Sequence, residues 1–264
     1  MKSLIYFILF VTLVSASRPV CNDDFDPTHI RFIEKTPAGN YLFRMGMPKY
    51  PNGTFAYEGI RTYYPKVAAE NGVDFPEDYY LIDISLLNEE PWDVDLERKY
   101  FEANPVHGRM INWPTFGLSF NDIKKGCQYA GIPENECNSS QPRDFTPENI
   151  KKMALALPHY GAIDNLYLFF SMVRTFLDTP HEKPYVVFWH CECGCDRVGQ
   201  VSASYVLQFK GWNFTEAMKW DEDVPKRHIW INNQVYVQWY CEYLNAIGKT
   251  RNTDCGNCEP FACE

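Results

Sequence analysis

The stretch from residue 185 to residue 210 constrains the fold more than any other part of this chain. Its apolar run "YVVFW" (185–189) is the most strand-like segment of the sequence, and the pattern over Val198–Lys210 predicts a helix that ends before Gly211. A buried strand that passes through a short loop into a helix is typical of a parallel sheet. We therefore expect the chain to fold around an α/β unit.

The remaining sequence repeats this alternation of strands and helices. Strands are predicted within 29–48, where two short strands flank a turn, and at 79–87 and 109–116. Helices are predicted at 93–104, from Thr146 onward, over Asp164–Asp178, and in a last segment ending at Gly248. The chain of 264 residues suits one sizeable core. The predicted fold class is therefore a single α/β domain with a central, largely parallel sheet flanked by helices.

Residues 117–145 are the exception to this alternation. They contain Cys127, Cys137 and a glycosylation acceptor, and we interpret them as an irregular, exposed loop or insertion. A Cys127–Cys137 disulfide would close this segment.

The N-terminus predicts a secretory signal peptide over residues 1–17. Lys2 supplies a positive charge, an apolar run follows it, and Ser15, Ala16 and Ser17 match a cleavage site. No second apolar run is long enough to span a membrane. We expect a globular domain at 18–248, a Cys-rich tail at 249–264, and a mature protein in the secretory-pathway lumen or outside the cell.

The cysteines and glycosylation acceptors fit an oxidising compartment. Ten cysteines in a secreted chain favour disulfide bonds, including bonds that tie down the tail. They are Cys21, Cys127, Cys137, Cys191, Cys193, Cys195, Cys241, Cys255, Cys258 and Cys263. Three sequons predict N-glycosylation at Asn52, Asn138 and Asn213. Asn213 could also cap a helix containing Glu216.

The charge of the chain limits its partners. The formal net charge is −9, and no basic stripe or lysine run is present. Nucleic acid and anionic membranes are therefore poor candidates, and polyanionic substrates would be repelled unless a local pocket overrides the field. The oligomeric state is left open.

The loop "HCECGCDR" between the predicted strand and helix has the residues of an anion-binding site. Ligands bind at such strand ends in α/β sheets because backbone N–H groups at the helix N-terminus face the crevice. Gly194 would let the loop curl, and Arg197 would add a bidentate donor for phosphate oxygens. The same positive field would favour the thiolate of Cys191, a nucleophile.

His190-Cys191-x5-Arg197, with Gly194 and Gly199, resembles the signature loop of the cysteine-dependent protein tyrosine and dual-specificity phosphatases. The segments "YLFRMGMP", "YLIDISLLNEEPWD" and "GWNFTEAM" are also similar to parts of that family. The resemblance covers about two thirds of the mature chain, loosely outside the loop. It implies a phosphatase-like fold for the domain at 18–248.

The resemblance also implies roles for individual residues. Cys191 would be the nucleophile, Arg197 would bind phosphate and stabilise the transition state, and His190 would order the loop and tune the thiolate. The rest of the phosphate-binding loop would be Glu192, Cys193, Gly194, Cys195, Val198 and Gly199. Some lipid and bacterial members use the aspartate before the arginine as general acid, which here is Asp196. Asp164 and His159 are the reserve candidates, although Asp164 also suits a helix N-terminus.

Several alternatives remain open at this point. The family usually has serine or threonine where this chain has Val198, so an inactive secreted phosphate-binding or interaction module is a second hypothesis. A zinc site on the clustered cysteines is disfavoured by their one-residue spacing, and no metal or cofactor is expected. Disulfides are expected at Cys193 and Cys195 more than at Cys191, although a reversible Cys191 bridge is possible.

The substrate predicted from the loop is a phosphotyrosine or another single phosphomonoester. Family members that act on inositol phosphates or phosphoinositides tend to carry lysines in the loop. This loop has Glu192 and Asp196 and no lysine, so an inositol-phosphate or phosphoinositide substrate is a minor alternative.

Overall fold

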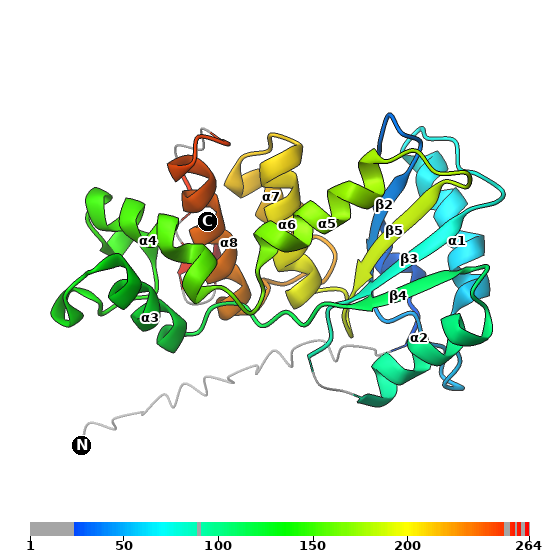
Figure 1. The fold of residues 1–264 in the computed structure, drawn as a ribbon, viewed down its shortest axis with the longest axis horizontal. Helices are drawn as coiled ribbons and strands as arrows, with labels where there is room; N and C mark the ends of the chain where they lie inside the picture. Colours follow the sequence, from blue (N-terminus) through cyan, green and yellow to red (C-terminus); the bar gives the residue numbers. More distant parts are fainter. Residues whose placement is uncertain (1–23, 89–90, 251–253, 257, 260–261, 264) are drawn as a thin grey trace, which may run out of the picture.

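A five-stranded sheet forms the centre of the molecule (Figure 1). The computed structural model describes residues 24–88, 91–250, 254–256, 258–259 and 262–263. The strand order is β1-β2-β5-β3-β4, in which β1 runs antiparallel to β2 and the other neighbours are parallel. The strands are β1 Arg31–Lys35, β2 Tyr41–Met45, β3 Tyr80–Ser85, β4 Gly108–Asn112 and β5 Tyr185–His190. The predicted signal peptide lies outside the described residues.

Helices cover both faces of this sheet (Figure 1). On one face lie α1 Tyr57–Glu70 and α2 Pro91–Ala103, and on the other lie α5 Leu166–Asp178 and α6 Asp196–Phe209. Four helices extend outward from α6: α7 Phe214–Glu222, α8 Ile231–Ala246, α4 Pro147–Tyr160 and α3 Phe120–Ala130. Short 3-10 turns stand at Pro27–His29, Glu134–Glu136 and Pro142–Asp144, and Cys258–Glu259 pairs with Ala262–Cys263. None of the helices in the described part of the chain is long and apolar enough to cross a membrane.

The two faces of the sheet bury separate hydrophobic cores. Phe188 and its neighbours pack under α1 on one face, where the rings of Phe43 and Tyr64 stack 4.3 Å apart. Trp189 belongs to the larger core under α5 and α6. Successive side chains of a strand point to opposite faces, so His190 follows Phe188 onto the α1 and α2 face. The fold-class prediction of a single α/β domain with a largely parallel sheet is confirmed.

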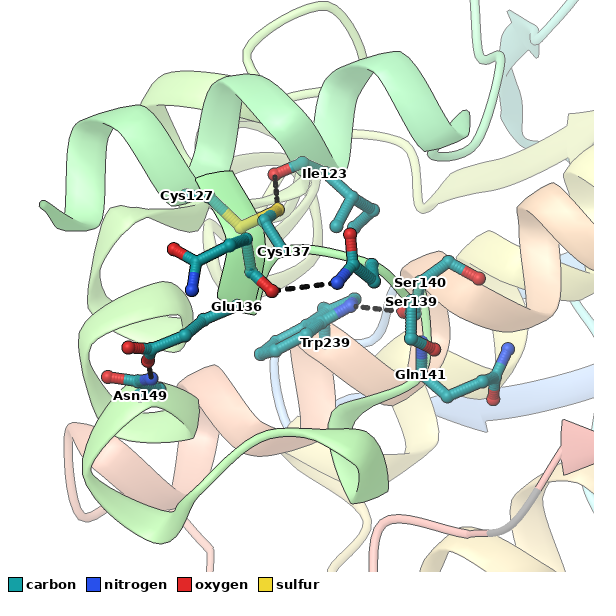
Figure 2. The surroundings of a disulfide bond; sticks show 11 residues. Ile123, Cys127, Glu136, Cys137, Ser139, Ser140, Gln141, Asn149 and Trp239 are labelled. Atoms are coloured by element: carbon teal, nitrogen blue, oxygen red, sulfur yellow. Dashed lines mark hydrogen bonds between the residues drawn. A yellow bond between two sulfur atoms is a disulfide. The ribbon is translucent and has the colours of Figure 1, made fainter. Parts of the chain in front are cut away.

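The prediction of an irregular loop at 117–145 is wrong, because this segment contains helix α3. Ser119 and Asp122 form a reciprocal capping box: the Ser119 hydroxyl accepts from the Asp122 N–H, and the Asp122 carboxylate accepts from the Ser119 N–H. The Ser-x-x-Asp pattern and the spacing of Ile123 and Cys127 were the available signals. The predicted Cys127–Cys137 disulfide is confirmed (Figure 2).

A second disulfide joins α8 to the tail. Cys241 in α8 is bonded to Cys255, so the prediction that disulfides tie down the tail is confirmed for Cys255. The side chains of Cys258 and Cys263 lie outside those that the structure describes.

Candidate active site

The predicted loop joins β5, the central strand, to α6 at the carboxyl edge of the sheet. Neighbouring strands hold both of its sides. The carbonyl of His190 accepts from the N–H of Leu86 at 2.9 Å, and the carbonyl of Glu192 accepts from the N–H of Met47 at 2.8 Å. The segments after β3 and β2 therefore fix the start of the loop.

Two carbonyl groups of the loop, those of Glu192 and Gly194, point outward. Glu192 O accepts from Met47 N–H, and Gly194 O accepts from Arg44 Nη2 at 2.7 Å. In a trans peptide the next N–H points away from the carbonyl, so the N–H groups of Cys193 and Cys195 face away from these anchors. Outward carbonyls with inward amides are the arrangement that an anion nest needs.

At two positions, Gly194 and Gly199, neighbouring atoms lie so close that only glycine fits. Gly194 has a φ of +67°, and a Cβ there would lie 2.6 Å from both Gly46 N and Met45 O on the β2 side. A Cβ at Gly199 would lie 2.2 Å from Asp221 Oδ2, so this glycine lets α6 pack against α7. Gly194 therefore serves the curl of the loop, as predicted, whereas Gly199 serves the packing behind it.

Arg44 and Asp221 form a buried ion pair behind the loop that was not identified from the sequence. Arg44 comes from β2 and Asp221 from α7, and both side chains are 0% exposed. The guanidinium also donates to Gly194 O and lies 5.4 Å from the centre of the Trp220 ring. Burial raises the pKa of Asp221 to about 6, although Arg44 opposes this. A single arginine in the otherwise apolar run "YLFRM" was the available signal.

Two further ion pairs lie at the partly exposed rim of the loop. Asp196 accepts from both terminal nitrogens of Arg227, at 2.8 and 2.9 Å, and from the N–H of Trp230 at 2.8 Å. Arg197 Nη2 lies 3.3 Å from Glu192 Oε2. The predicted phosphate-binding guanidinium therefore already has a carboxylate partner within its own loop.

The three loop cysteines are in different states. Cys191 and Cys195 are free, buried thiols, whereas Cys193 is disulfide-bonded. The prediction of a disulfide is confirmed for Cys193 and wrong for Cys195. Burial raises the pKa of the Cys195 thiol to about 12, and nearby Cys191 adds to this, so Cys195 stays neutral at physiological pH. Val198 is fully buried in the core under α6.

Asp164 does not cap α5; Asn165 does so, by accepting from the Leu168 N–H. Instead, the buried Asp164 carboxylate accepts from the N–H groups of Phe116 and Gly117, each at 2.8 Å, and from Gln200 Nε2 at 2.7 Å. Burial raises its pKa to about 6, against these three donors. Asp164 therefore holds the segment after β4 against α6.

His159 is exposed and stacks on Tyr129 of α3, with ring centres 5.5 Å apart. His159 thus packs on an outer helix, and among the described residues it makes no hydrogen bond, ion pair or ring contact with residues 191–197. The sequence spacing alone suggested this residue.

His190 contacts two buried carboxylates that the sequence did not reveal. Its Nε2 lies 3.2 Å from Asp83 Oδ1 of β3 and 3.2 Å from Glu97 Oε1 of α2, and all three side chains are 0% exposed. Burial lowers the pKa of His190, but the two carboxylates outweigh this and raise it well above its ordinary value. Burial also raises the pKa of Glu97 to about 7.

No protein-family model matches the chain, and no curated protein matches it either. Among solved structures, the chain is similar to Tk-PTP in a mutant form, with 15% identity and a TM-score of 0.39 over 84% of this chain and 99% of that chain. It is also similar to TpbA of P. aeruginosa, with 15% identity and a TM-score of 0.35 over 87% and 98% of the two chains. A TpbA structure in complex with pTyr gives 14% identity and a TM-score of 0.31 over 77% and 78%.

Proposed function

We propose that this protein is a secreted phosphomonoester hydrolase of the cysteine-dependent tyrosine and dual-specificity type. The observation that carries the proposal is the loop itself: a free cysteine and an arginine flank a curled backbone whose anchored carbonyls point outward. A phosphate bound there receives the inward amides and the Arg197 guanidinium, which would displace Glu192 from it.

In this reaction the Cys191 sulfur attacks phosphorus, so an S–P bond forms while the ester P–O bond breaks. The leaving oxygen takes a proton from the general acid, and Arg197 stabilises the charge on the equatorial oxygens. Water then attacks phosphorus and gives its proton to the same carboxylate. The S–P bond breaks, and inorganic phosphate and the free thiolate are released.

Asp196 is the general acid in this proposal, because it is the carboxylate of the loop next to Arg197 and is only partly buried. Asp164 is buried and lies outside the loop, where it binds the backbone after β4. An acid matters most for poor leaving groups. Asp196→Asn should therefore lose about 10²–10⁴-fold in turnover on an alkyl or phenyl phosphate and much less on p-nitrophenyl phosphate. An equal loss on both substrates would remove Asp196 from this role.

The direct test of the function uses the mature, disulfide-bonded protein with an aryl phosphate and a mild reductant. Wild type should turn over, and Cys191→Ser should be inactive while it still binds phosphate. Turnover by Cys191→Ser would contradict the mechanism. The matched control is Cys195→Ser, which removes the other free, buried thiol of the loop and should remain active.

A phosphate-binding or interaction module without turnover is the second candidate. The observation in its favour is Val198, which is fully buried and has no hydroxyl to help the thiolate leave phosphorus. Under the enzyme proposal, rapid mixing should give a burst of released alcohol, followed by slow release of phosphate. Val198→Thr should then speed the slow phase. Phosphate binding without any burst in wild type would favour the binding module.

The proposed substrate is a phosphotyrosine or another single phosphomonoester. Glu192 and Asp196 place two carboxylates at the rim, which disfavours polyphosphorylated inositol rings. A preference for an inositol polyphosphate over phosphotyrosine peptides would contradict this choice.

Secretion rests on the predicted signal peptide at 1–17, and we keep the domain bounds of 18–248 and 249–264 with it. The disulfides are compatible with an oxidising compartment. Asn52, Asn138 and Asn213 are exposed, as glycosylation requires. Asn213 caps α7 by accepting from the Glu216 N–H through Oδ1, which leaves Nδ2 for a glycan. Secretion into culture medium and a mass loss on deglycosylation would test this.

A further inference from the structure

Asp83, Glu97 and His190 form a sealed cluster on the α1 and α2 face of the sheet, next to the loop that begins with Cys191. They come from three elements, β3, α2 and β5, and all three side chains are 0% exposed. One potential ligand atom from each lies within 4.8 Å of the others. Ser85, opposite His190 in the sheet register, is also buried. Polar groups this deep in a core require partners.

The cluster does not satisfy its own hydrogen bonds. Both oxygens of Asp83, both oxygens of Glu97 and both ring nitrogens of His190 are buried without a hydrogen-bond partner among the described residues. The Ser85 hydroxyl is in the same condition. Nε2 of His190 faces two carboxylate oxygens at once, and a single imidazole nitrogen has only one proton or one lone pair to offer. The polar atoms of the three side chains therefore face one common point and do not form separate hydrogen-bonded pairs.

The spacing of these atoms fits a metal ion at that point. Two ligands on a tetrahedral ion with bonds of about 2.0 Å stand about 3.3 Å apart. Nε2 of His190 lies 3.2 Å from each carboxylate oxygen. We propose that Asp83, Glu97 and His190 bind a divalent transition-metal ion of the Zn²⁺ type, with Ser85 or a water molecule as fourth ligand.

Charge balance supports the same conclusion. Two ionised carboxylates in a sealed interior need two positive charges, which one divalent ion supplies. Asp221, another carboxylate at 0% exposure, pairs with an arginine, whereas the cation that Asp83 and Glu97 contact among the described residues is a single shared histidine. The ion would clamp α2 onto the sheet and place positive charge one residue from Cys191. The site does not depend on the proposed phosphatase activity.

Metal content tests the proposal. The full secreted chain, expressed without a polyhistidine tag, should carry about one zinc ion per chain by mass spectrometry of the elements. Glu97→Gln and Asp83→Asn should each lower this to about a tenth or less, since a neutral amide is a poor zinc ligand. Asp164→Asn is the matched control, because it removes another buried carboxylate outside the cluster and should keep the metal.

Two measurements on the wild type keep the test decisive where a variant does not fold. Replacement by Co²⁺ should give visible absorption bands without the sulfur charge-transfer band that binding at Cys191 or Cys195 would produce. Removal of the metal should lower the melting temperature, and added Zn²⁺ should restore it. Folded wild-type protein that carries no metal and takes up none would overturn the proposal, whatever its phosphatase activity.

Discussion

The ion pair behind the loop and the ion pairs at its rim hold the same backbone in different ways. Arg44 and Asp221 are 0% exposed, and Arg44 also donates to the carbonyl of Gly194 in the loop. At the rim, Arg197 with Glu192 and Asp196 with Arg227 are partly open to water. A buried pair is costly to break, whereas an exposed pair exchanges its partners readily. The difference indicates that the back of the loop fixes its shape while the rim is free to accept a ligand.

The largest expected effect is at the buried pair. Arg44→Met leaves Asp221 buried without its cation and should lower the free energy of unfolding by about 3–5 kcal/mol in denaturant titrations. The double variant Arg44→Met with Asp221→Leu should regain most of this loss, because it removes both charges. A single variant as stable as wild type would mean that the pair does not hold the loop.

The next largest effect is expected in the pH dependence of the free energy of unfolding, and it comes from the buried carboxyl of Asp164 and not from the rim. Burial raises the pKa of Asp164 from 3.8 to about 6, so between these values the folded protein keeps a proton that the unfolded chain has released. This group's contribution to the free energy of unfolding should therefore fall as pH rises from about 4 to 6, by about 3 kcal/mol in total. Asp164→Asn should flatten the pH profile by that amount. An unchanged slope in the variant would show that the pKa of this carboxyl is not raised.

Under the proposed function, Glu192 at the rim competes with the phosphate ligand for Arg197. Glu192→Gln should therefore strengthen phosphate binding about 3- to 10-fold, measured by calorimetry on the Cys191→Ser background. Stability should change by less than about 0.5 kcal/mol, because this glutamate is partly exposed. Weaker phosphate binding in the variant would show that the carboxylate positions the arginine and does not compete with the ligand.

The smallest effect is expected at Arg227. Arg227→Gln should cost less than about 1 kcal/mol of unfolding free energy, because the pair is partly exposed and Asp196 keeps the Trp230 N–H. A loss similar to that of Arg44→Met would remove the distinction between the back of the loop and its rim.

The features predicted correctly are those that short stretches of sequence encode. The strand at 185–189, the loop and the following helix are contiguous, so apolar pattern and glycine placement identified them. The partners of the loop are not contiguous. Arg44 forms an ion pair with Asp221, which lies 177 positions later in the sequence. Glu97 contacts His190 only because α2 packs on the sheet. No local pattern records such pairings.

Asp164 lies at the N-terminus of α5, as the sequence suggested, but its hydrogen-bond partners are in other elements, which the sequence did not show. Helix α3 was missed because Cys127, Cys137 and the Asn138 acceptor suggested an exposed loop, although its apolar period and its Ser119–Asp122 capping box were visible in the sequence.

The Cys127–Cys137 disulfide has a consequence for the cooperativity of the molecule. It spans only ten residues within the outer helical layer, and the segment that follows Cys137 toward α4 accepts a hydrogen bond from the Trp239 indole at Ser140 O (Figure 2). Closing a loop of this length is worth about 3 kcal/mol, all of it local. A strong reductant added to protect Cys191 should therefore let α3 and its neighbours open more often, which hydrogen exchange would detect as a separate unfolding unit. The sheet that carries the loop should keep its protection.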